Sequence, residues 1–178
     1  MDYRHRCIRP AFLFCALVLA GVASAAQSGA LTKGDRTFIE KAAKGGVAEV
    51  ELGNLAQQKA QNQQVKDFAS RMVKDHSKAN DELKGIASAK GVTVPAEMDK
   101  SAVKEKEKLE KLAGAKFDRE YMSHMVKDHK KDVKEFADEA KNAKDPDVKN
   151  FAASTLPTLQ EHLKLAQAAE RAAKNQPK

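Results

Sequence analysis

The chain has 178 residues, with 32 Lys and Arg against 25 Asp and Glu, two Cys and no Trp, and its mean hydropathy is −0.61. This length and polarity are typical of one soluble domain. Both cysteines, Cys7 and Cys15, lie close to the N-terminus, so the rest of the chain has no thiolate metal site, cysteine nucleophile or CxxC redox motif.

The segment 1–25 is typical of a secretory signal. Three arginines precede an apolar run at 11–22, and the small residues Ala-Ser-Ala follow at 23–25. The run is shorter than the ~20 residues that a membrane-spanning helix needs. We therefore expect a periplasmic or otherwise exported protein, with cleavage near Ala25 and no transmembrane helix in the mature chain.

The mature chain expected after cleavage is a mixed-charge polypeptide. Removing 25 of 178 residues leaves 153; three basic residues and one acidic residue are lost, leaving 29 and 24, a net charge of +5. Basic residues alternate with acidic ones, and no basic stripe is interleaved with aromatic residues. We expect no nucleic acid partner, and the sequence does not indicate a protein partner.

Gly, Pro and capping residues divide the mature chain into an all-helical pattern. Long helices are predicted at 35–61, 62–90, 116–143 and 145–172, with a short charged helix at 100–112 in the connection. The predicted domain boundaries are a flexible segment at 26–34, a bundle at 35–173 and a disordered tail at 174–178.

An internal repeat predicts how these helices connect. Val-Lys-Asp-Phe-Ala at 65–69 recurs as Val-Lys-Asn-Phe-Ala at 148–152, and the same offset in sequence relates the helix caps Asn62 and Asp145. The two turns should therefore be alike. Two αα-hairpins joined by a long crossover form the ferritin-like four-helix bundle.

Each long helix carries one ionisable residue within its apolar face, in contrast to His124, which lies on the outer face. At about 100° per residue, the neighbours within about 60° of each such residue are mostly apolar. Each also lies within about one turn, ~5 Å, of the middle of its helix. In an antiparallel bundle these side chains should meet in one layer: Glu49, His76, His129 and His162.

Such a buried layer needs something to satisfy its polar atoms. Three imidazoles and a carboxylate suit one transition-metal ion such as Zn, Fe or Cu. The alternative is a hydrogen-bonded core network in which Glu49 pairs with a protonated histidine and sets the bundle register. Asp75, Asp128 and Glu161 each precede an inward histidine, and they could accept the second ring N–H of a histidine on a neighbouring helix.

Two methionines extend the choice of metals. Met72 and Met125 each lie four residues before an inward histidine, and thioether with imidazole would favour Cu(I). Methionine also commonly fills irregular helical cores, and we regard core packing as the default role.

Four ordered motifs resemble the bacterial domain-of-unknown-function family 4142. They are FIEKAAKGGVAEVELGNLA, VKDFASRMVKDHSKANDEL, FDREYMSHMVKDH and FAASTLPTLQEHLKLA, and they span most of the mature chain. The resemblance implies a ferritin-like fold outside the cytoplasm and no established reaction.

The sequence departs from the di-iron pattern of ferritin-like proteins, which needs Glu-x-x-His on two helices. Val73, Val126 and Leu159 stand where those glutamates would be. We therefore expect a mononuclear site for metal handling or envelope stress, or a non-catalytic envelope structural protein. No catalytic triad order, phosphate loop or paired carboxylates indicate a reaction, so a non-enzymatic role is favoured.

Overall fold

The computed structural model describes residues 31–176, and this part of the chain contains five helices and no strand. The helices are α1 (Lys33–Lys59), α2 (Gln63–Ala89), α3 (Lys100–Glu110), α4 (Gly114–Asn142) and α5 (Pro146–Lys174). The predicted all-α bundle is confirmed. None of the described helices is both long and apolar enough to cross a membrane. The predicted signal sequence lies outside the described residues.

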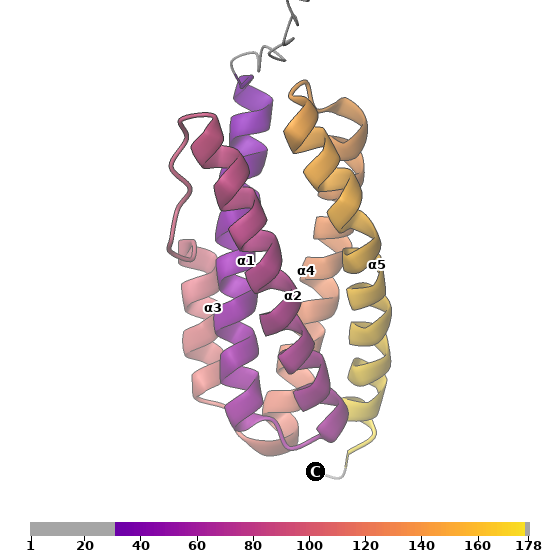
Figure 1. Cartoon of the computed structure of the whole chain (residues 1–178). Helices are drawn as coiled ribbons and strands as arrows, with labels where there is room; N and C mark the ends of the chain where they lie inside the picture. Colours follow the sequence, from indigo (N-terminus) through magenta and orange to yellow (C-terminus); the bar gives the residue numbers. More distant parts are fainter. Residues whose placement is uncertain (1–30, 177–178) are drawn as a thin grey trace, which may run out of the picture.

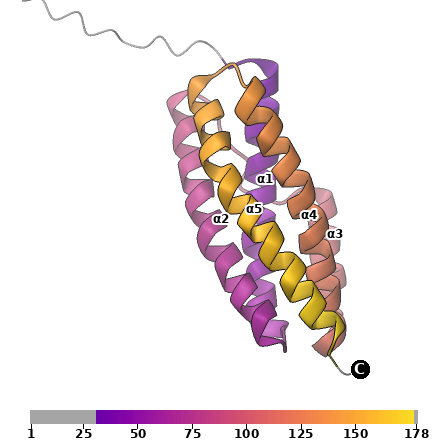
Figure 2. The same cartoon turned by 90° about the vertical axis from the view of Figure 1, so that its right-hand side faces the viewer.

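The four long helices form two antiparallel hairpins, α1 with α2 and α4 with α5 (Figure 1). Helix α2 ends at the same end of the bundle at which α1 begins, so the chain must run back along the bundle before α4 starts. This crossover carries α3, which packs against α1 and α4. Helix α2 also packs against α5, and α1 against α4 (Figure 2). The bundle has the predicted ferritin-like connectivity.

Local capping fixes the helix ends. Thr32 and Asp35 form a capping box, so α1 begins at Lys33, two residues before the predicted start. Leu31, just before this cap, is buried. Asn62 and Asp145 cap α2 and α5, as the sequence predicts.

Two buried aspartates hold the hairpins together at opposite ends of the bundle. Asp118 of α4 accepts hydrogen bonds from the backbone N–H groups of Gln61 at 3.1 Å and Asn62 at 2.9 Å, in the α1–α2 turn. Asp35 of α1 accepts one from the N–H of Lys144 at 3.1 Å, in the α4–α5 turn. The internal repeat relates Asp35 to Asp118 and Gln61 to Lys144 by the same offset in sequence. Because each aspartate binds the turn of the other hairpin, each hairpin fixes the position of the other along the bundle axis.

A close approach of α1 to α2 explains why position 53 is a glycine. A Cβ atom at Gly53 would lie 2.9 Å from Cγ2 of Val73 and 3.2 Å from the carbonyl oxygen of Ala69. Only glycine lets the two backbones pack at this distance. The glycine therefore sets the spacing of the helices that carry the central residues.

The hydrophobic core is split into two clusters along the bundle axis. One includes Phe68, Met72 and Tyr121 near the α1–α2 turn, and the other includes Phe38 and Phe136 near the α4–α5 turn. The inward histidines come between these clusters in the sequence of each helix. The bundle thus buries a polar layer between two apolar ones.

Candidate metal centre

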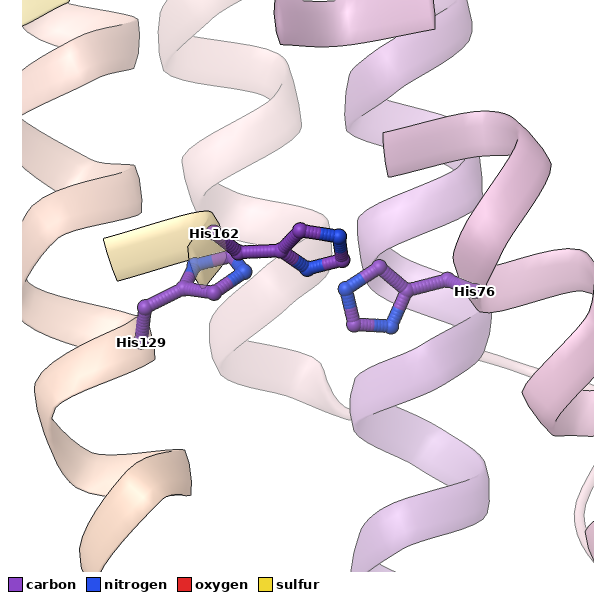
Figure 3. A group of neighbouring side chains, drawn as sticks. All are labelled: His76, His129 and His162. Carbon is purple, nitrogen blue, oxygen red and sulfur yellow. The ribbon is translucent and has the colours of Figure 1, made fainter. Parts of the chain in front are cut away.

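Three histidines from three helices meet inside the bundle (Figure 3). His76 comes from α2, His129 from α4 and His162 from α5, and they are 8%, 0% and 1% exposed. Their ring centroids are 5.7 Å, 5.3 Å and 5.4 Å apart for the pairs 76–129, 76–162 and 129–162. One nitrogen of each ring lies within 4.8 Å of the other two. The sequence predicted these three side chains to converge.

Hydrogen bonds define which ring nitrogens carry lone pairs. Nδ1 of His129 lies 3.0 Å from the carbonyl oxygen of Met125, and since a carbonyl only accepts, Nδ1 donates and Nε2 keeps its lone pair. Nε2 of His162 donates to Oδ2 of Asp75 at 2.9 Å, which leaves Nδ1 free. Nε2 of His76, Nε2 of His129 and Nδ1 of His162 are buried without a hydrogen-bond partner. Each ring therefore has one buried nitrogen without a partner, and in His129 and His162 the other nitrogen carries the proton.

The surroundings keep these imidazoles neutral. Burial, together with the neighbouring rings, lowers the pKa of His76 from 6.5 to about 3. Burial also lowers the pKa of His129 from 6.5 to about 4, and it lowers that of His162. A metal ion binds the neutral ring. The site therefore presents three unprotonated ligands at neutral pH.

Asp75 has the predicted role of orienting a histidine from another helix. It accepts from His162 and also from Nε of Arg71 at 3.1 Å. Burial would raise the pKa of Asp75, but these two hydrogen bonds hold it below its usual value. Asp128 and Glu161, predicted for the same role, have no such bond to a histidine among the described residues. Asp128 lies in a carboxylate group, and Glu161 pairs with a lysine on its own helix.

Glu49 is not part of the histidine group. Its Oε1 atom is 3.7 Å from Nδ1 of His129, on the ring edge that faces the Met125 carbonyl. Its carboxylate lies with those of Asp128 and Asp132, with one oxygen of each within 4.8 Å of the others. The structure thus brings together three of the four predicted ligands and places Glu49 beside the ring of His129.

Sequence reasoning did not single out Asp132 as a site residue. A signal was present, because the offset of the internal repeat relates Glu49 to position 132. Asp128 and Asp132 are also four residues apart and share one face of α4. The inward direction alone did not show which neighbouring helix each carboxylate would meet.

A cavity borders the histidine layer. A cavity of about 390 Å³ is lined by His76, His162, Asp75, Thr155 and other residues of α2 and α5. Its polar wall leads from the surface to two of the three rings. The cavity thus borders the histidine group from the side of α2 and α5.

The sulfur and phenol groups near the layer belong to the hydrophobic core. Met72 and Met125 are completely buried within the same apolar cluster as Tyr121. The Tyr121 hydroxyl has no hydrogen-bond partner among the described residues, and burial raises its pKa well above 10. These contacts support core packing as the role of both methionines.

Comparison with known proteins identifies a family and a fold. The family profile "Domain of unknown function (DUF4142)" matches residues 20–169, and no curated protein matches the chain in sequence. Solved structures that share the fold include the following three. "CopM in the Cu(II)-bound form" has a TM-score of 0.66 at 20% identity over 77% of this chain and 95% of that chain. "CopM in the Ag-bound form" has a TM-score of 0.63 at 22% identity, over 77% and 95%. A DUF305 fragment from Deinococcus radiodurans has a TM-score of 0.70 at 13% identity, over 79% and 97%.

Proposed function

The chain belongs to the DUF4142 family, and we propose that it is a metal-handling protein that binds one copper ion between His76, His129 and His162. The observation that carries this proposal is the convergence of three buried histidines, each of which has one buried ring nitrogen without a hydrogen-bond partner. Leaving such atoms buried and unpaired is costly, and an ion would satisfy all three at once.

The geometry requires only a modest contraction. Metal–imidazole bonds of about 2.0–2.1 Å bring nitrogens to roughly 3.3–3.5 Å from one another. In the structure the ligand atoms lie within 4.8 Å of one another, so shifts of about 1 Å would complete the site. The cavity beside His76 and His162 leaves room for a further exchangeable ligand.

Copper is the metal that these ligands and the structural neighbours favour. Imidazole suits copper and zinc, and Cu²⁺ forms the most stable complexes of the divalent first-row series. Two of the structures with this fold are named as copper- and silver-bound forms of CopM. Zinc and iron remain the competitors to be compared.

The decisive experiment measures bound metal in the chain 26–178, purified without a His-tag and offered Cu, Zn and Fe separately. We expect one copper per chain, with stronger retention than zinc or iron. His76→Gln, His129→Gln and His162→Gln should each lose it, whereas His124→Gln, on the same helix as His129, should retain it. Absence of stoichiometric metal, or equal loss in His124→Gln, would contradict the proposal. Apolar replacement of the layer with unchanged or higher stability would then support the structural alternative.

We further propose that the protein handles this metal in the cell envelope after export. The support is the predicted signal sequence at 1–25. Intact-mass measurement of the protein recovered from the periplasm should give a chain that begins at Ala26. Recovery of the uncleaved chain in the cytoplasm would contradict export.

A further inference from the structure

A second group of ligand-bearing side chains lies beside the histidines and is not used by the copper proposal. It consists of Glu49 from α1 with Asp128 and Asp132 from α4, and one oxygen of each lies within 4.8 Å of the others. We propose that this carboxylate cluster binds a divalent cation that prefers oxygen ligands.

Glu49 provides the observation that points to a ligand. Its side chain is completely buried, and neither carboxylate oxygen meets an N–H or hydroxyl donor among the described residues. Its neighbour Asp128 could form a hydrogen bond with it only by sharing a proton. An ionised carboxylate in such a place needs a compensating positive charge. The 3.7 Å between Oε1 and Nδ1 of His129 is too long for a hydrogen bond, and that nitrogen already donates to Met125.

Lys41, Lys44 and Lys131 line the adjoining cavity, but none of the ion pairs among the described residues joins a lysine to Glu49, Asp128 or Asp132, and Lys41 pairs with Glu135. Asp128 and Asp132 add two carboxylates that repel Glu49. Lys131 is the cation that acts on Asp132, but its side chain is exposed. A bound divalent cation would neutralise most of the local negative charge, whereas without one the cluster must hold protons.

A cavity gives access to the cluster. It has a volume of about 500 Å³, and Asp128 and Asp132 are among its lining residues, together with His124, Glu135 and Gly45. A Cβ atom at Gly45 would meet no atom within 4 Å, which shows how open this wall is. Glu49 is not a lining residue, so it would be the inner ligand.

The donor atoms define the class of cation. Carboxylates and water suit Mg²⁺, Ca²⁺ and Mn²⁺, whereas the imidazole group suits copper or zinc. The cluster therefore differs in chemistry from the histidine group, although both border His129. The two sites use separate ligands, so either can exist without the other.

The test is a Mn²⁺ titration of the chain 26–178 followed by electron paramagnetic resonance, in wild type and in His162→Gln. Both should bind one Mn²⁺, with Ca²⁺ tested as a competitor. Glu49→Gln and Asp132→Asn keep the side-chain shapes and should each weaken Mn²⁺ binding by about tenfold or more, because each removes one ligand charge. Asp138→Asn, an exposed control on α4, should bind as wild type.

Three results would overturn this assignment. They are no saturable Mn²⁺ binding at millimolar concentration, unchanged binding in Asp132→Asn, or equal weakening in Asp138→Asn. Thermal unfolding of each variant verifies that the bundle is intact. Because His162→Gln removes a copper ligand only, loss of copper with retained Mn²⁺ separates this site from the histidine site.

Discussion

Replacing Asp75 with alanine tests how the bundle prepares His162 to bind a metal. The carboxylate accepts the Nε2–H of His162 at 2.9 Å, so it selects the tautomer whose Nδ1 atom is free and holds the ring in place. Without it, the ring can rotate and carry its proton on either nitrogen. The change leaves every proposed copper ligand in the protein.

The expected loss of copper affinity is about 10–100-fold, which is typical when a partner that orients a ligating histidine is removed. This corresponds to roughly 1.4–2.7 kcal/mol. This free-energy cost is consistent with the loss of a hydrogen bond to a charged group. Solvent weakens that bond, because the Asp75 side chain is 24% exposed.

Copper affinity would be measured by competition with a chromophoric chelator, in wild type, Asp75→Ala and Arg71→Ala. The arginine variant removes the 3.1 Å contact to Asp75 without touching His162, and its affinity should stay within about threefold of wild type. If Asp75→Ala binds copper as tightly as Arg71→Ala, the orienting role assigned to the carboxylate is refuted.

Three further predictions concern packing, turn bonding and pH. Gly53→Ala should destabilise the bundle by about 1–3 kcal/mol because the added methyl group meets α2. Gly85→Ala, which places its methyl group with nothing within 4 Å, should stabilise the bundle by roughly 0.5–1 kcal/mol. If urea unfolding ranks the two variants the other way, the close approach of α1 and α2 is unimportant for stability. Asp118→Ala should cost roughly 2–4 kcal/mol in the same assay, since it leaves two turn N–H groups without their acceptor, and a cost below about 1 kcal/mol would contradict the clamp. The buried imidazoles, with pKa values of about 3 and 4, make the metal-free bundle more stable as pH rises toward 6.5, because the unfolded chain binds more protons. Asp132, whose pKa burial and the Asp128 charge raise to about 7, opposes this rise between about pH 4 and 7. Asp132→Asn should therefore make the free energy of unfolding rise more steeply with pH, by at most about 1.4 kcal/mol per pH unit. An unchanged dependence of the free energy of unfolding on pH would show that Asp132 does not titrate in this way.

The sequence predicted the fold well because local signals determine it. Asn62 and Asp145 mark helix starts through their caps, and the repeat between the two turns predicted two similar hairpins. The start of α1 was predicted two residues late, because the Thr32–Asp35 capping box was not recognised. Helix ends depend on such single side-chain contacts, and the hydrophobic periodicity of the sequence does not reveal them.

The candidate site was predicted in part. Helical spacing showed that His76, His129 and His162 point inward, and the similar helix lengths placed them at one height. It did not show that Glu49 lies beside the ring of His129 and with Asp128 and Asp132, because this depends on which side of α4 faces α1. Tertiary packing, such as the close approach at Gly53, decides where a side chain lies around the bundle axis. The helical periodicity of the sequence does not.

X-ray absorption spectroscopy of the copper-loaded chain tests the central claim most directly. The account predicts about three nitrogen neighbours at roughly 2.0–2.1 Å, with the scattering pattern of imidazole rings, and the loss of one ring in His162→Gln. A sulfur neighbour would instead point to Met72 or Met125. A spectrum with sulfur ligands, or with no imidazole contribution, would contradict a copper centre built from His76, His129 and His162.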